Sequence, residues 1–162
     1  RVIALGHSAG GHLALWAASR ARIPPSSQLY VAEPLKIGAV ISLAGIGDLE
    51  GQGRIFAMPC GDDTIERLVD TAHRQQAFVD TSPAELLPSG AKVVMAHGVF
   101  DAVMPPYTGQ DYAAKVREAG DIADVEIIAG SGHFDLVIPG TAAWTRIVVI
   151  LDRETEALAH GR

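Results

Sequence analysis

The sequence has 162 residues, of which 48% are hydrophobic and 20% are charged, and its formal net charge is −6. This composition is typical of one globular domain with a hydrophobic core, and it excludes an intrinsically disordered chain. Lysines and arginines form no cluster, so we expect no nucleic-acid partner. Apolar runs are far shorter than the roughly 20 residues that span a bilayer, so we expect no membrane span. Cys60 is the only cysteine, which excludes an internal disulfide and leaves the cellular compartment open.

Short apolar runs and helix-like segments alternate along the chain. The apolar runs predict strands at residues 1–5, 37–45, 91–98 and 123–130. The helical patterns predict helices at residues 9–21, 64–78, 107–120 and 140–159. Residues 48–63 are polar and glycine-rich and are predicted to form a loop, and the run SPAELLPSG predicts a turn with a short helix. This alternation predicts a parallel sheet of about four strands with flanking helices, and functional groups at the carboxyl ends of the strands.

The first candidate for a catalytic group is Ser8, within the pentapeptide Gly6-His7-Ser8-Ala9-Gly10. The pentapeptide fits the pattern G-x-S-x-G and lies between a predicted strand and a predicted helix, as a nucleophile elbow requires. Small flanking residues permit the tight turn that projects the serine oxygen out of the sheet. The free N–H groups at the start of the following helix can stabilise an oxyanion. An ordinary glycine-rich strand-to-helix turn is the alternative interpretation.

A serine hydroxyl needs a general base, and the sequence offers six histidines. His133 is favoured because it follows the fourth predicted strand, in the run AGSGHFDLV, and therefore lies at the same edge of the sheet as Ser8. We expect structural or surface roles for the others: His7 beside the strand, His12 on the helix, His97 as a hydrogen-bonding residue, and His73 and His160 at the surface.

The base needs a carboxylate that orients it. Asp101 is favoured because it follows the third predicted strand, in the run HGVFDAVMPP, at the same edge of the sheet. Asp48 and Asp135 are the alternatives. We expect Asp48 to cap a loop after the second strand. Asp135 is too close to His133 in sequence to reach its ring easily, so we expect it to cap or line its own loop.

The chain order Ser8, Asp101, His133 is the order of the triad in α/β-hydrolases. The stretches GHSAGGHLALWAA, SPAELLP, HGVFDAVMPP and GSGHFDLV resemble α/β-hydrolases of the esterase/lipase group, most of all acyl and feruloyl carboxylesterases and kynurenine formamidases. The resemblance covers almost the whole chain, in the order of the second half of that fold. It implies an α/β fold in which Ser8 is the nucleophile, Asp101 the acid and His133 the base. It also implies that the backbone N–H of Ala9 is one oxyanion donor.

The same resemblance implies a second oxyanion donor in a glycine-rich HGG-type loop that precedes the elbow. Only five residues precede Gly6 in this sequence. We therefore expect residues 1–162 to be a single partial domain, the C-terminal portion of a longer polypeptide, with weak activity or none when isolated. Residues 1–5 would then be a central strand whose missing neighbours leave an apolar edge, which favours association. The oligomeric state stays open.

The leading hypothesis is hydrolysis of a small-molecule carboxylic ester through an acyl-enzyme on Ser8, without a metal or an organic cofactor. The first alternative is an amide-type hydrolase that uses the same residues, either arylformamidase-like or oligopeptidase-like. The second is an α/β-hydrolase fold that serves as a non-catalytic binding module, which the intact set Ser8, Asp101 and His133 disfavours.

The segment 47–83 joins the second strand to the next helix and is a possible substrate-facing insertion. Phe56, Met58 and Phe78 are candidates for the lining of an acyl pocket. Ordinary packing under a long loop is at least as good an explanation for each of them.

Overall fold

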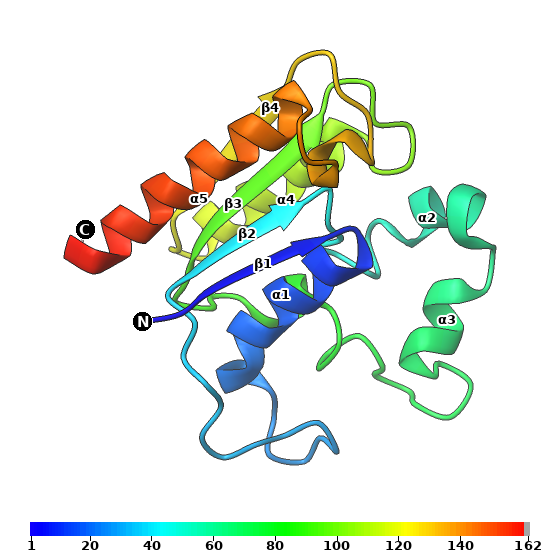
Figure 1. Ribbon diagram of the computed structural model, residues 1–162. Coiled ribbons are helices and arrows are strands. Elements are labelled where there is room, and N and C mark those ends of the chain that lie inside the picture. Colours follow the sequence, from blue (N-terminus) through cyan, green and yellow to red (C-terminus); the bar gives the residue numbers. More distant parts are fainter. Residues whose placement is uncertain (161–162) are drawn as a thin grey trace.

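The computed structural model describes residues 1–160 and places four parallel strands in one sheet (Figure 1). The strands are β1 (Ile3–His7), β2 (Ala39–Leu43), β3 (Lys92–Gly98) and β4 (Ala123–Ile128), and they lie in the order β1-β2-β3-β4. All three pairings are parallel, with Leu5 opposite Ile41 and Ile41 opposite Val94. The prediction of a parallel sheet of about four strands is confirmed, although the first strand extends to His7 rather than ending at residue 5.

Helices cover both faces of the sheet, because side chains alternate between the faces along each strand. The helices α1 (Ala9–Ser19) and α4 (Pro106–Glu118) pack on one face, and α5 (Ala142–His160) packs on the other (Figure 1). Strand side chains of the first face include Val40, Val93 and Met95, and those of the second include Ile41, Val94 and Ala96. Within residues 1–160, no helix is both long and apolar enough to cross a membrane.

The connection between β2 and β3 differs from its prediction. The helix α2 (Gly53–Cys60) lies in the stretch predicted to be a loop, and its Phe56 is buried in the core. The predicted helix 64–78 is cut short, because α3 (Thr64–Val69) ends where Asp70 adopts a left-handed backbone with a φ of 60°. Single turns of 3-10 helix occur at Arg20–Arg22, Pro83–Leu86 and Asp135–Val137, the second of them where a short helix is predicted.

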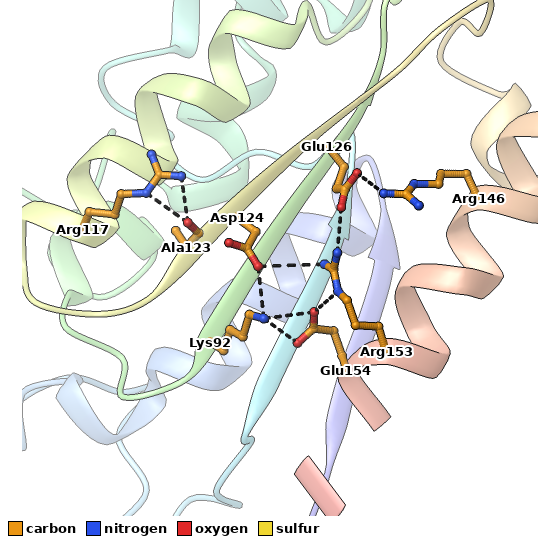
Figure 2. Close-up of polar contacts among 8 residues, drawn as sticks. All are labelled: Lys92, Arg117, Ala123, Asp124, Glu126, Arg146, Arg153 and Glu154. Atoms are coloured by element: carbon orange, nitrogen blue, oxygen red, sulfur yellow. Dashed lines mark hydrogen bonds and ion pairs between the residues drawn. The ribbon is translucent and has the colours of Figure 1, made fainter. Parts of the chain in front are cut away.

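Charged side chains tie α5 to the strands beneath it (Figure 2). Glu154 of α5 is buried, and its carboxylate accepts hydrogen bonds from Lys92 Nζ at 3.1 Å and from Arg153 Nε at 2.8 Å. Lys92 belongs to β3 and also contacts Asp124 of β4 at 3.0 Å. Burial opposes the charge on Lys92, but its bonds to Glu154 and Asp124 outweigh burial and raise the pKa of this amine. Arg153 also donates to Glu126 of β4 at 2.9 Å, so α5 is fixed to both strands.

The first strand occupies one edge of the described sheet. β1 pairs with β2, and its outward neighbour position is unpaired within residues 1–160. Val2 and Leu5 are exposed there. The association of this apolar edge with another chain stays a prediction.

Candidate active site

The predicted site residues follow three different strands. Ser8 follows β1 directly, Asp101 lies in the loop between β3 and α4, and His133 lies in the loop after β4. Because the strands are parallel, their carboxyl ends meet at one edge of the sheet. The topology therefore places all three residues at that edge.

Ser8 has a strained backbone in the turn between β1 and α1. Its φ of 54° and ψ of −120° lie in a region that residues with a side chain rarely adopt, at a cost of about 1–3 kcal/mol. The Ser8 N–H donates to the carbonyl oxygen of Leu43 at 2.9 Å, and the Ser8 carbonyl accepts from the N–H of His12 at 3.1 Å. These bonds to β2 and to the first turn of α1 hold the turn in its strained form.

Two glycines make this tight turn possible. A Cβ on Gly6 would lie 2.1 Å from the carbonyl oxygen of Gly10, which is a backbone atom that cannot move aside. A Cβ on Gly11 would lie 2.8 Å from the Cα of Gly45, so α1 packs directly against the end of β2. Gly10 differs, because a Cβ there would meet no atom within 4 Å.

Ala9 is the first residue of the eleven-residue helix α1. The N–H groups in the first turn of a helix have no carbonyl one turn earlier to bind, and they lie at the positive end of the helix dipole. The backbone N–H of Ala9 thus adjoins Ser8 without a helical partner, and it can stabilise negative charge that develops beside the serine oxygen.

Asp101 Oδ2 and His133 Nδ1 lie 2.8 Å apart, and both side chains are buried. The other carboxylate oxygen of Asp101 accepts the backbone N–H groups of Val103 at 2.9 Å and Met104 at 2.7 Å. These two bonds fix the direction in which Oδ2 points. Because His133 donates from Nδ1, its neutral ring carries the lone pair on Nε2, where a general base can use it.

The loops that carry Asp101 and His133 are joined directly. The N–H of Phe100 donates to the carbonyl oxygen of Ser131 at 2.9 Å. Gly98 permits this approach, since a Cβ there would lie 2.5 Å from the same Ser131 oxygen. Asp135 caps the second loop by accepting the N–H of Gly132 at 2.7 Å, in agreement with the role predicted for it.

His97 contacts the loop that carries Asp101. It is buried at the end of β3, and its Nδ1 donates to the carbonyl oxygen of Met104 at 3.2 Å. Met104 is the residue whose N–H binds Asp101, so His97 helps to fix the carboxylate. Burial is the main cause that lowers the pKa of His97. The predicted hydrogen-bonding role of His97 is confirmed.

His7 is the residue whose contacts the sequence analysis missed. Its Nε2 lies 2.9 Å from the backbone oxygen of His133, and the two ring centroids are 4.5 Å apart. The ring of Phe134 contacts both, with its centroid 5.9 Å from that of His7 and 5.1 Å from that of His133. The only signal in the sequence is that His7 directly precedes Ser8.

Two other residues considered from the sequence, Asp48 and His12, make contacts elsewhere. Asp48 binds the N–H of Gly51 at 2.8 Å and the ammonium of Lys115 at 2.6 Å, so it caps its loop as predicted. The bond from Asp48 is the main cause that raises the pKa of Lys115. His12 is buried and donates from Nδ1 to the carbonyl oxygen of Ile46 at 3.1 Å, which confirms its packing role.

The apolar candidates of the segment 47–83 divide between core and surface. Phe56 is buried in the core, Met58 is 94% exposed, and Phe78 packs at the margin of the core. An apolar cavity of about 180 Å³ lies beside α1, and its lining includes Trp16 and Leu68. Within residues 1–160, no group of three or more His, Cys, Asp or Glu side chains is placed to hold a metal ion.

No protein-family model and no curated protein matches this sequence, but solved structures resemble the fold. Esterase 2 of Thermogutta terrifontis matches with a TM-score of 0.68 and 19% identity, over 96% of this chain and 54% of the esterase chain. The acylaminoacyl peptidase of Pyrococcus horikoshii matches with a TM-score of 0.62 and 18% identity, over 88% of this chain and 21% of that chain. A puromycin-hydrolyzing peptidase of Mycobacterium tuberculosis matches with a TM-score of 0.56 and 22% identity, over 82% and 19%.

These similarities confirm the predicted fold class. The four parallel strands and their flanking helices have the arrangement of the α/β-hydrolase fold. The chain spans about half the length of the esterase that it resembles. At identities near one residue in five, this likeness establishes the fold and not the reaction.

Proposed function

We propose that the protein carrying this chain is a serine hydrolase that cleaves small-molecule carboxylic esters through an acyl-enzyme on Ser8. The observation that carries the proposal is the buried hydrogen bond between Asp101 and His133, at the edge of the sheet where Ser8 occupies a strained turn. The esterase of T. terrifontis adds support, because its fold matches nearly the whole of this chain.

The three side chains have different roles in this mechanism. The Ser8 oxygen attacks the ester carbonyl carbon while His133 Nε2 accepts the hydroxyl proton. Asp101 holds the ring in the required tautomer and stabilises the imidazolium that forms. His133 then protonates the leaving alcohol as the C–O bond breaks, which leaves the acyl group on Ser8. Water repeats the cycle on the acyl-enzyme, releases the acid and restores the serine.

The oxyanion of each tetrahedral intermediate needs hydrogen-bond donors. The backbone N–H of Ala9 is the donor that this chain offers, at the start of α1. The resemblance assigns a second donor to a loop that precedes the elbow, and removal of one such donor typically lowers the rate about 10²–10³-fold. The proposed activity is therefore that of the full-length polypeptide.

We propose that the segment 47–83 faces the substrate. It begins after β2, at the same edge of the sheet as Ser8, and two of its residues, Leu49 and Leu68, line the apolar cavity beside α1. This placement supports binding of an apolar part of the substrate along the segment. The separate roles of Phe56 and Met58 as pocket residues are not supported, because one is in the core and the other is in solvent.

A fluorophosphonate probe tests the nucleophile. We expect the full-length protein to be labelled, and the Ser8→Ala variant to be unlabelled under the same conditions. Ser26→Ala is the matched control, since Ser26 is an exposed serine far along the chain from the turn. Labelling of Ser8→Ala at the wild-type rate would remove Ser8 from the mechanism.

Amide-type hydrolysis is the second candidate, and the similarity to acylaminoacyl peptidase and to a puromycin-hydrolyzing peptidase favours it. The same three side chains can cleave either bond, so the substrate must decide. We expect faster turnover of p-nitrophenyl acetate than of N-formylkynurenine or an N-acyl peptide. The reverse order would assign the protein to the amide-type hydrolases. A folded full-length protein that no probe labels would instead be a binding module.

A further inference from the structure

His7 connects two parts of the site that no strand pairing joins. It is the last residue of β1, whereas His133 follows β4, and these strands lie at opposite ends of the order β1-β2-β3-β4. The side chain of His7 nevertheless reaches the His133 loop, with Nε2 2.9 Å from the His133 carbonyl oxygen. The two rings also contact each other, with centroids 4.5 Å apart and an interplanar angle of 50°.

The chemistry of this contact fixes the tautomer of His7. A carbonyl oxygen only accepts, so His7 donates from Nε2–H and its neutral ring carries the lone pair on Nδ1. Burial is the main cause that lowers the pKa of His7, and the nearby His133 lowers it further, while the bond to the carbonyl and the charge of Asp101 act in the opposite direction. A neutral His7 adds no like charge beside His133 when that ring takes the serine proton.

We propose that His7 is a positioning residue that holds the His133 ring at the correct place relative to Ser8. This inference rests on the proposed function. His7 is covalently adjacent to Ser8, and its backbone lies opposite Leu43 in the sheet, which also accepts the Ser8 N–H. The link from nucleophile to base therefore runs through one peptide bond and one side chain.

The contacts made by Asp101 and by the Phe100–Ser131 bond do not connect His133 to the strand that carries Ser8. Asp101 binds Nδ1 and sets the tautomer, but this hydrogen bond fixes the position of one ring atom only. The bond from Phe100 to Ser131 anchors the loop two residues before His133. His7 alone, among these contacts, joins the His133 backbone and ring to the strand that carries the nucleophile.

Two variants of His7 separate its donor from its ring. His7→Phe keeps an aromatic ring beside His133 and removes the donor, and His7→Gln keeps an N–H donor and removes the ring. We expect kcat for p-nitrophenyl acetate to fall roughly 10–100-fold in His7→Phe, with KM changed less than about twofold, because misplacement of the base affects the transition state and not substrate binding. We expect His7→Gln to recover most of kcat. His73→Ala, at an exposed histidine, is the control.

The outcomes distinguish this inference from the proposed function. Loss of kcat in His7→Phe with recovery in His7→Gln supports the positioning role. Wild-type kcat in His7→Phe, or equal losses in both variants that follow the loss of thermal stability, would overturn it. If Ser8→Ala is still labelled by fluorophosphonate, the proposed function fails first. If Ser8 is labelled normally and the His7 variants behave as wild type, only the role of His7 fails.

A measurement on the unmodified protein covers the case in which the variants do not fold. Nitrogen-15 NMR of histidine-labelled full-length protein reports the tautomer of each ring. We expect His7 to be protonated on Nε2 and His133 on Nδ1 at neutral pH. A His7 ring protonated on Nδ1 alone could not donate to the His133 carbonyl, and that result would overturn the inference.

Discussion

Asp101 and His133 are joined by a 2.8 Å hydrogen bond in a buried setting, although they follow different strands of the sheet. Further hydrogen bonds in the two loops hold this pair in place. The amides of Val103 and Met104 aim the carboxylate, and the Phe100–Ser131 bond brings the two loops together. The pair is therefore set by the ends of β3 and β4, which is how a rigid sheet can place catalytic side chains on irregular loops.

Asp101→Asn should abolish most activity without unfolding the protein. The asparagine oxygen can still accept the two backbone amides, but its NH₂ group then faces His133 Nδ1 and favours the opposite tautomer, with the proton on Nε2. His133 could no longer accept the serine proton. We expect kcat to fall roughly 10⁴-fold, because the wrong tautomer removes the proposed general base.

Asp48→Asn is the matched control for Asp101→Asn. Asp48 is also a buried aspartate that follows a strand and accepts a backbone amide, yet it binds Lys115 rather than a histidine. We expect its kcat to stay within about twofold of wild type. Steady-state kinetics of both variants decide the matter, and equal losses of kcat would show that Asp101 has no special role.

Gly6 and Gly10, which lie on either side of Ser8, should differ in their tolerance of alanine. Gly6→Ala places a Cβ 2.1 Å from a backbone oxygen, and the overpacking should destabilise the protein by about 3 kcal/mol or more. Gly10→Ala meets nothing within 4 Å and lies in α1, where alanine is favoured over glycine by about 1 kcal/mol. Urea unfolding of both variants measures the difference, and a similar loss of stability in the two would contradict the structure of the turn.

Much of the fold could be predicted from the sequence, because apolar strands of a parallel sheet form short continuous runs between helical segments. The failures lie between β2 and β3. The helix α2 contains Gly53 and Pro59, which have low helix propensity, and burial of Phe56 offsets that cost. The left-handed backbone at Asp70 ends α3 early, and nothing in the local pattern marks that residue as a stop.

The placement of the candidate residues could be predicted in the same way. Ser8, Asp101 and His133 each follow a predicted strand, and the parallel topology fixes where the strand ends lie. The contact between His7 and His133 could not be predicted in this way. It depends on the path of an irregular loop across the sheet edge, and that path leaves no periodic signal in the sequence.

Glu154→Ala should destabilise the protein more than the removal of an exposed charged side chain does. The Glu154 side chain is 1% exposed, and its removal leaves Lys92 and Arg153 without their shared carboxylate. Because both cations retain some contact with solvent and with other carboxylates, we expect a loss of about 2–3 kcal/mol. Asp124→Ala is the control: its side chain is 45% exposed, and we expect a loss below about 1 kcal/mol.

Unfolding free energies from denaturant titrations test this pair of variants. Equal effects of Glu154→Ala and Asp124→Ala would show that the buried carboxylate does not fasten α5 to β3. The side chains in Figure 2 show that both carboxylates approach the same ammonium group of Lys92, so the two variants remove partners of one cation.

The buried histidines His12 and His97 should make stability depend on pH near neutrality. Burial lowers the pKa of each in the folded protein, below the value of about 6.5 in the unfolded chain. Between these values the unfolded state binds more protons, so the free energy of unfolding falls as pH decreases below about 6.5 and is fully present above it. Each group contributes at most about 1.4 kcal/mol per pH unit.

Urea unfolding between pH 5.5 and 7.5 measures this slope. We expect the slope to decrease in His12→Gln, because this variant lacks a buried ring whose pKa burial lowers. The Gln side chain can keep a donor toward the Ile46 carbonyl, so the variant should still fold. A wild-type slope in this variant, or a slope of opposite sign in the wild-type protein, would contradict the buried neutral state of His12.

In the proposed mechanism, Ser8 carries the acyl group during turnover. Acid quenching of the full-length protein during p-nitrophenyl acetate hydrolysis, followed by peptide mapping with mass spectrometry, tests it most directly. We predict an acetyl group on Ser8 in the peptide that contains residues 6–10, and none in the same peptide from Ser8→Ala. Continued turnover with the acetyl group on another residue, or undiminished turnover in Ser8→Ala, would contradict the mechanism.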